Sequence, residues 1–210
     1  GVLESDIYEV KEFYELVGAW CSITPDEKSL INLEISIRVD GKFSKYFTYG
    51  DWRLYGENLY YNQDDVDSYM SVDEIMPKDG KKADAFKFRV TLTNNTKLFL
   101  VAISYETKKY SVEFDNSLLK KDYIKKYDVP KLNQNMVPVI GNQMCSATTT
   151  AMLLKYKGFD FSEFDEFENR YIANLVADRG HNNPTYGNWV YNTVTMGAFG
   201  LDSYVRHMTS

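Results

Sequence analysis

The residue of this 210-residue chain best placed to do chemistry is Cys145. It lies between a turn-forming stretch, residues 141–143, and an apolar, helix-like run, residues 147–154. A cysteine in the first turn of a helix meets the positive end of the helix dipole, which favours the thiolate, and the thiolate is the nucleophile. A preceding glutamine can donate a hydrogen bond to a developing oxyanion. The alternative is a small buried hydrophobe, because many free cysteines are no more than that.

A wider pattern surrounds this cysteine. An extended segment with a proline and a glutamine precedes a loop, the cysteine and a helix that closes in a tyrosine and a glycine: Asp128, Val129, Pro130, Gln134, Cys145, Tyr156 and Gly158. The pattern resembles the start of papain-like cysteine peptidases related to the bacteriocin-processing, double-glycine-leader peptidases. Residues 186–192 and 200–205 look like the helical half of that family, so the resemblance covers roughly residues 126–210.

The resemblance implies a reaction and its residues. Cys145 would be the nucleophile, Gln134 the oxyanion donor and a peptide or protein the substrate, with no cofactor. Gln143 is an alternative donor, because it is a local neighbour of Cys145 in any fold. The chain departs from the family at Ser146, where the family usually has glycine. The family also carries its catalytic histidine and acid further on than residue 210.

A thiol nucleophile needs an imidazole to form the thiolate–imidazolium pair. The chain has two histidines, His181 in an expected loop and His207 in an expected short strand, residues 204–207. Their simplest interpretation is a solvated loop residue and a strand-end residue. If either serves Cys145, chain order favours His207. We expect the chain to be the first part of a longer protein and to lack a complete catalytic set as it stands.

Three functions from different classes remain open. The first is a thiol hydrolase acting through Cys145. The second is a catalytically inactive, peptidase-like module that binds peptide in the same cleft. The third is a β-barrel binding or anchoring domain, for which the C-terminal half is only a partner.

The N-terminal part has the period-two pattern of strands. Residues 31–39 alternate between apolar and polar, a hairpin signal follows at Asp40 and Gly41, and a second strand is expected at residues 42–47. Further strands are expected at four places, namely residues 52–61, 85–93, 98–105 and 109–114. Successive strands with short turns predict an up-and-down meander that closes into a small barrel.

Gly18 and Trp20 resemble the G-x-W opening of lipocalin-like barrels. By that resemblance Gly18 permits close backbone approach and Trp20 plugs one end, although the family's partner arginine is missing from residues 108–115. A β-domain that only packs against the peptidase part is the alternative. The sequence therefore predicts an α+β protein, an antiparallel β-meander or barrel followed by the helical half of a papain-like cysteine peptidase domain.

Charge helps to place a domain boundary. Residues 1–119 hold 21 acidic and 14 basic side chains, a balance of −7, whereas residues 120–210 hold 9 and 10, a balance of +1. The lysine-rich junction predicts a lipocalin-like domain at residues 1–119, a linker at 120–127 and an incomplete peptidase domain at 128–210.

Composition excludes several classes. A net charge of −6 without a basic face argues against nucleic acid as a partner. No apolar run of about 18 residues is present, so no membrane span is expected. The cysteines and histidines do not cluster at metal-ligand spacing, and the acidic segment 64–67 lacks the glycine and distal glutamate of a calcium loop. We expect a secreted or cell-surface bacterial protein, a core position for Cys21 without a disulfide to Cys145, and homodimerisation through the incomplete peptidase half.

Overall fold

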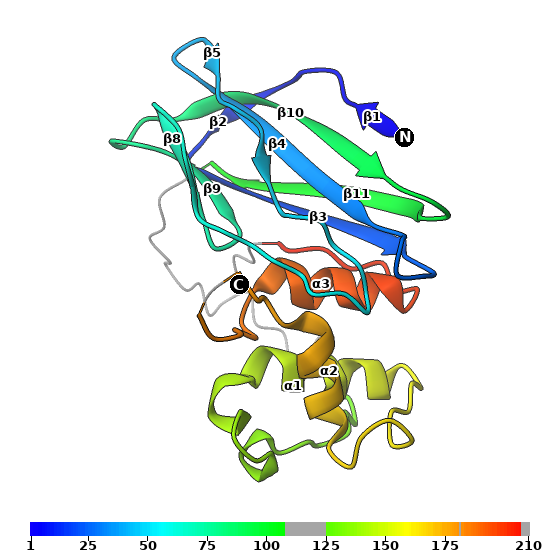
Figure 1. The fold of residues 1–210 in the computed structure, drawn as a ribbon. Coiled ribbons are helices and arrows are strands. Elements are labelled where there is room, and N and C mark those ends of the chain that lie inside the picture. The colour runs from blue at the N-terminus through cyan, green and yellow to red at the C-terminus, as the bar shows by residue number, and fades with distance from the viewer. Residues whose placement is uncertain (108–124, 181, 207–210) are drawn as a thin grey trace.

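The computed structural model describes residues 1–107, 125–180 and 182–206. Antiparallel strands in the first part curl into a half-barrel, and helices follow. Figure 1 shows the strands on one side of the molecule, α3 (Trp189–Ala198) directly against them, and the other two helices farther away. The predicted α+β class, strands first and helices second, is confirmed.

The strands form two sheets. The first, sheet A, has β10 at its centre, between β4 on one side and both β1 and β2 on the other. Its strands are β1 (Val2–Glu4), β2 (Tyr8–Phe13), β4 (Ile31–Val39), β5 (Lys42–Phe43), β6 (Phe47–Thr48) and β10 (Ala83–Leu92).

The second, sheet B, has the order β11-β3-β9-β8-β7. Its strands are β3 (Glu15–Ile23), β7 (Gln63–Asp64), β8 (Ser68–Ser71), β9 (Glu74–Pro77) and β11 (Lys97–Glu106). All pairings in both sheets are antiparallel.

The strongest strand prediction is confirmed. β4 covers residues 31–39, and its apolar residues Ile31, Leu33, Ile35 and Ile37 are fully buried. The hairpin signal also holds, because Asp40 and Gly41 have φ values of 49° and 76°, the positive values that a tight hairpin turn requires.

The strand order differs from an up-and-down meander. β3 pairs with β11 and β9 rather than with β4, which follows it in the chain. Hairpin signals specify only neighbouring strands, and burial decides which strands pair over longer separations. The strand predicted at residues 109–114 lies outside the described residues.

The strand predicted at residues 52–61 is wrong. The segment makes two isolated bridges instead of a ladder, an antiparallel one between Trp52 and Ile31 and a parallel one between Asn58 and Asp178. The later backbone groups bond to the helical part instead, with the Tyr60 amide donating to Asp178 Oδ1 at 3.1 Å and the Arg179 amide to the Asn58 carbonyl at 2.9 Å. This segment therefore joins the two halves of the molecule rather than extending a sheet.

Aromatic rings fill the inside of the half-barrel. Trp20 is fully buried, with its ring centroid 6.0 Å from that of Tyr49 and 6.1 Å from that of Trp52. A Cβ at Gly18 would lie 2.6 Å from Ile35 Cδ1, so core side chains, rather than the backbone expected from sequence, fill the space beside Gly18. The comparison with a lipocalin-like barrel stays a prediction.

Three α-helices and two 3₁₀ turns make up the described C-terminal part. They are η3 (Gln134–Met136), η4 (Gly141–Gln143), α1 (Cys145–Tyr156), α2 (Glu168–Val176) and α3. Lys157 is the C-cap of α1, and Gly158 follows with a φ of 94°, a left-handed position that suits glycine. The helix expected after Cys145 thus has the expected end.

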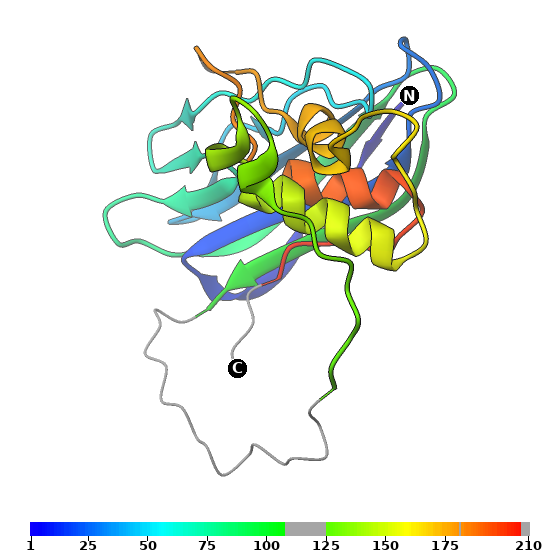
Figure 2. The same cartoon turned by 90° about the horizontal axis from the view of Figure 1, so that it is seen from below.

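α3 packs closely on sheet B at Gly197. A Cβ at Gly197 would lie 2.9 Å from the Cα of Cys21, so helix and strand approach closely at this point. Figure 2 shows the same arrangement from below, with the helices lying across the strands. Cys21 is buried under α3, as expected of a core thiol.

The strand predicted at residues 204–207 is not found in its described part, since residues 201–206 have no regular secondary structure. Side chains hold this segment instead: Ser203 Oγ donates to the Thr193 carbonyl at 2.7 Å, and Ser104 Oγ donates to the Val205 carbonyl. Most of the predicted linker, residues 120–127, lies outside the described residues, so the division at 119 and 128 stays a prediction.

Candidate active site

Cys145 is the first residue of α1 and is exposed. Met144 precedes it as the N-cap residue and makes no side-chain capping bond, and the first turn of α1 carries no acidic residue. The amides at this helix end are therefore not neutralised by a side-chain acceptor from the cap residue. Their partial positive charge acts on the sulfur of Cys145, which is the arrangement expected from the sequence.

The opposite face of α1 fixes the direction of Cys145. Ala147, Ala151 and Leu154 are fully buried, so this face is turned into the core. Two polar bonds anchor the helix to its neighbours: Asn169 Nδ2 donates to Thr148 Oγ1 at 3.2 Å, and Thr150 Oγ1 donates to Asn192 Oδ1 at 3.0 Å. With α1 held on these sides, Cys145 and Ser146 face outward.

Gln134 lies against the turn that leads into Cys145. Its Nε2 donates to the Gly141 carbonyl at 2.8 Å, which uses one of its two amide hydrogens. Gly141 is buried there, and a Cβ on it would lie 2.3 Å from the Gln134 carbonyl oxygen. This close contact ties Gln134 to the loop before the cysteine despite their separation in sequence. Gln143, the alternative donor, lies in the exposed end of η4.

Cys145 opens into a cavity of about 1180 Å³. One wall comes from α1 and α3, with Cys145, Thr149 and Trp189. The other wall comes from β3, β9 and β11 of sheet B, and residues 204–206 complete the lining. The two halves of the chain therefore contribute to one cavity, which is large enough for several peptide residues.

Both histidines, His181 and His207, lie outside the described residues. The preference for His207 as the partner of Cys145 thus stays a prediction, as do the roles of Cys145 and Gln134. Cys21 and Cys145 are both free thiols.

Lysines and backbone amides surround the acidic segment 64–67. Asp64 pairs with Lys78 at 2.8 Å and Asp67 with Lys81 at 2.6 Å. Asp65 accepts the Lys45 amide at 2.6 Å, and such bonds lower its pKa. Among the residues that the structure describes, no cluster of histidine, cysteine and carboxylate side chains could hold a metal ion.

Two family models match this chain. The model of the peptidase C39 N-terminal domain matches residues 1–99, and that of the peptidase C39-like family matches residues 126–207, the segment with Gln134 and Cys145. The chain belongs to the peptidase C39-like proteins. No curated protein and no solved structure matches it.

Membership makes this C39-like protein a cysteine peptidase-like protein, and it implies peptide substrates. In the described part of the chain, no helix is both long and apolar enough to cross a membrane. Secretion or cell-surface location in a bacterium, homodimerisation and the exclusion of nucleic acid stay predictions.

Sequence reasoning missed the sheet residues of the C39-like cavity. Glu15 and Glu74 line it from β3 and β9, and Trp189 lines it from the first turn of α3. Neither glutamate stands in a motif, because their common position results from strand pairing between residues about sixty apart. For Trp189 the sequence does hold a local signal, because Asn188 before it is a helix-capping residue and so indicates that Trp189 begins a helix.

Proposed function

We propose that this C39-like protein hydrolyses peptide bonds with Cys145 as its nucleophile. The supporting observation is that Cys145 is exposed at the N-terminus of a twelve-residue helix and opens into a large cavity. A buried structural thiol, the competing interpretation, would not be expected at this position.

The reaction would proceed in two steps. The Cys145 thiolate attacks the carbonyl carbon of the scissile bond, and the negative charge passes to the carbonyl oxygen. The tetrahedral intermediate collapses when a histidine donates a proton to the leaving amine, which leaves a thioester on Cys145. Water, deprotonated by the same histidine, attacks the thioester and releases the acid and the free thiol. His207 is our candidate for this histidine.

Gln134 would stabilise the oxyanion. Its Nε2 keeps one N–H beyond the bond to Gly141, and that bond fixes the amide beside the loop that ends at Cys145. A donor fixed before the reaction costs no reorganisation when charge develops, which is the basis of oxyanion stabilisation.

The test is cleavage of a mixture of synthetic peptides, followed by mass spectrometry, with matched variants. We expect Cys145→Ala to abolish cleavage by a protein with a complete catalytic set, while circular dichroism stays unchanged. Loss of cleavage in His207→Ala but not in His181→Ala would assign the catalytic histidine to His207. Cleavage by Cys145→Ala would refute the proposal. Peptide binding without cleavage by the unmodified protein would favour the inactive binding module instead.

A further inference from the structure

The register of sheet B places three glutamates together. Glu15 of β3 is paired with Glu106 of β11, and Leu16, the next residue, is paired with Ile75 of β9. Leu16 and Ile75 are fully buried in the half-barrel, so the residues before them, Glu15 and Glu74, point to the opposite face of the sheet. Three carboxylates from adjacent strands thus share one end of one face.

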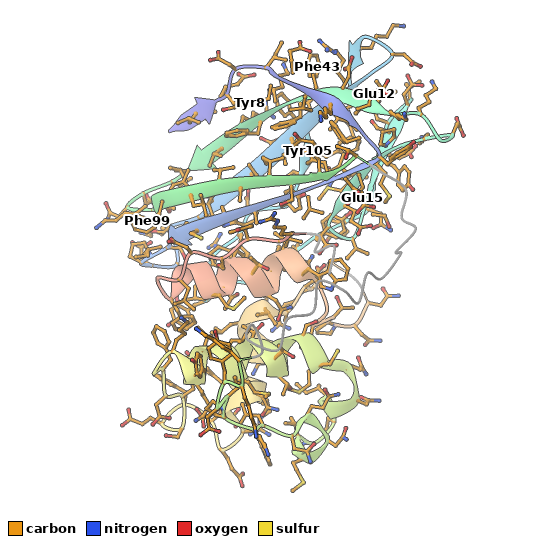
Figure 3. All side chains as sticks on the ribbon, turned by 180° about the vertical axis from the view of Figure 1, so that it is seen from behind. Tyr8, Glu12, Glu15, Phe43, Phe99 and Tyr105 are labelled. Carbon is orange, nitrogen blue, oxygen red and sulfur yellow. The ribbon has the colours of Figure 1, made fainter. Side chains whose placement is uncertain are left out.

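That face forms the sheet wall of the Cys145 cavity. Glu15, Glu74 and Glu106 are all among the lining residues, and Trp189 lies on the helix wall of the same cavity. Figure 3 labels Glu15 at the end of β3 that lies toward the first turn of α3. The glutamates and the candidate nucleophile Cys145 therefore line the same cavity from its two walls.

Neighbouring carboxylates repel one another when both are ionised. Glu74 is half-buried, and burial raises its pKa, with the charges of Glu15 and Asp73 raising the pKa further. Glu106 has an interaction partner of its own, which leaves Glu15 and Glu74 as the pair that faces a ligand. Among the described lining residues, Arg206 is the one basic side chain, against these three acidic ones.

We infer that Glu15 and Glu74 determine specificity, selecting peptides that carry a lysine or arginine side chain. The inference rests on the proposed function, since it names the substrate class of the Cys145 cavity. A cation between the two carboxylates would replace their repulsion by two attractive contacts in a space that is partly shielded from water. An acidic side chain at the same place would add a third like charge.

Trp189 makes this binding measurable. Its side chain is 55% exposed and lines the cavity, whereas Trp20 and Trp52 are fully buried in the half-barrel. A ligand in the cavity should change the fluorescence of Trp189 with little change from the other two. The Trp189→Phe variant should lose most of the signal, which checks its origin.

The experiment titrates the full chain with blocked alanine hexapeptides that carry lysine, glutamine or glutamate at the third position. We expect the lysine peptide to bind about tenfold more tightly than the glutamine peptide at low salt, and the glutamate peptide to bind most weakly. Glu74→Gln and Glu15→Gln should each reduce the lysine preference by about fivefold. Glu57→Gln, an exposed glutamate that does not line the cavity, is the matched control and should keep the preference.

Equal binding of the lysine and glutamine peptides would overturn the inference, as would an unchanged preference in both Glu74→Gln and Glu15→Gln. A lysine preference in a protein that cleaves none of the peptides would leave the inference standing and remove the hydrolase. Cleavage that depends on Cys145 but shows no charge preference would support the hydrolase and overturn the inference.

Discussion

Asp73 Oδ2 accepts the backbone amide of Trp189 at 2.8 Å and that of Val190 at 3.3 Å. A carboxylate from the turn between β8 and β9 thus binds the N-terminus of α3, more than a hundred residues away in the chain. Asp73 is only 4% exposed. The contact joins the part matched by the C39 N-terminal model to the part with Cys145, and it lies beside the cavity wall that Trp189 contributes.

Removing this carboxylate should weaken the junction between sheet B and α3. We expect Asp73→Ala to lower the free energy of unfolding by about 1–2 kcal/mol, since one buried and one partly buried helix-end amide lose their acceptor. Asp73→Asn keeps an acceptor oxygen and should lose less. Urea denaturation measures both variants, and equal stability of Asp73→Ala and the unmodified protein would show that water replaces the carboxylate without cost.

The same residue should give stability a pH dependence. Burial raises the pKa of Asp73 above its ordinary value of 3.8, and the nearby Asp178 charge adds to the rise. Because the folded-state pKa exceeds the unfolded one, the folded protein holds the proton more tightly. This contribution is therefore greatest at low pH and is lost as the pH rises through the folded value. As the pH rises above about 4, the stability of the unmodified protein relative to Asp73→Asn should fall. A constant difference would contradict the burial of the charge.

Gly197 should be required for the docking of α3. Its Cβ as alanine would meet Cys21 Cα at 2.9 Å and Cys21 Sγ at 3.0 Å, so helix and strand would have to separate. We expect Gly197→Ala to lower the free energy of unfolding by about 1–2 kcal/mol. This loss is what remains after the higher helix propensity of alanine, about 1 kcal/mol, has offset part of the clash. Gly187→Ala is the control, because nothing lies within 4 Å of its Cβ. Thermal unfolding of both variants tests the contact, and similar midpoints would argue against close packing.

The two thiols should differ in reactivity. Cys145 is exposed, whereas Cys21 is 2% exposed and its Sγ lies 3.4 Å from the Ser203 amide. Iodoacetamide should modify Cys145 rapidly in the folded protein and Cys21 only after denaturation. Peptide mapping identifies which cysteine has reacted. In Cys145→Ala the rapid phase should disappear. Rapid modification of Cys21 would mean that α3 leaves sheet B readily.

Substitution of Gln134 and of Gln143 should have different effects on the kcat of the proposed hydrolase. We expect Gln134→Ala to lower kcat by about 10²- to 10³-fold, the usual loss when one oxyanion donor is removed. Gln143→Ala should change kcat little, because that side chain lies on the exposed end of η4. A larger loss in Gln143→Ala would exchange the two roles.

Local signals in the sequence predicted local structure. The alternation of residues 31–39 predicted β4 with its bounds, and Asp40 and Gly41 predicted the turn, because side-chain period and positive φ are properties of neighbouring residues. The strand predicted after the turn, residues 42–47, is shorter in the structure, where β5 covers Lys42–Phe43 and β6 covers Phe47–Thr48. The loop-to-helix position of Cys145 and the helix end at Gly158 were predictable for the same reason.

Contacts between distant residues were not predictable in this way. Residues 52–61 contain strand-forming aromatics, yet their backbone bonds to Asp178 and Arg179. Asp73 resembles any turn carboxylate until α3 is placed against it. Glu15 and Glu74 become neighbours only through the pairing of β3 with β9. Each of these depends on which surfaces pack together, and a single sequence contains no local signal for that.

The hydrogen bond between the Ser203 amide and Cys21 Sγ spans 182 residues of sequence. Such contacts form slowly, because much of the chain must be ordered before they close. During synthesis β3 leaves the ribosome long before α3 exists, so the face around Cys21 stays uncovered while the residues between β3 and α3 are made. A helix translated long after β3 therefore protects that strand from aggregation, and the need for a chaperone at this face should fall once α3 docks.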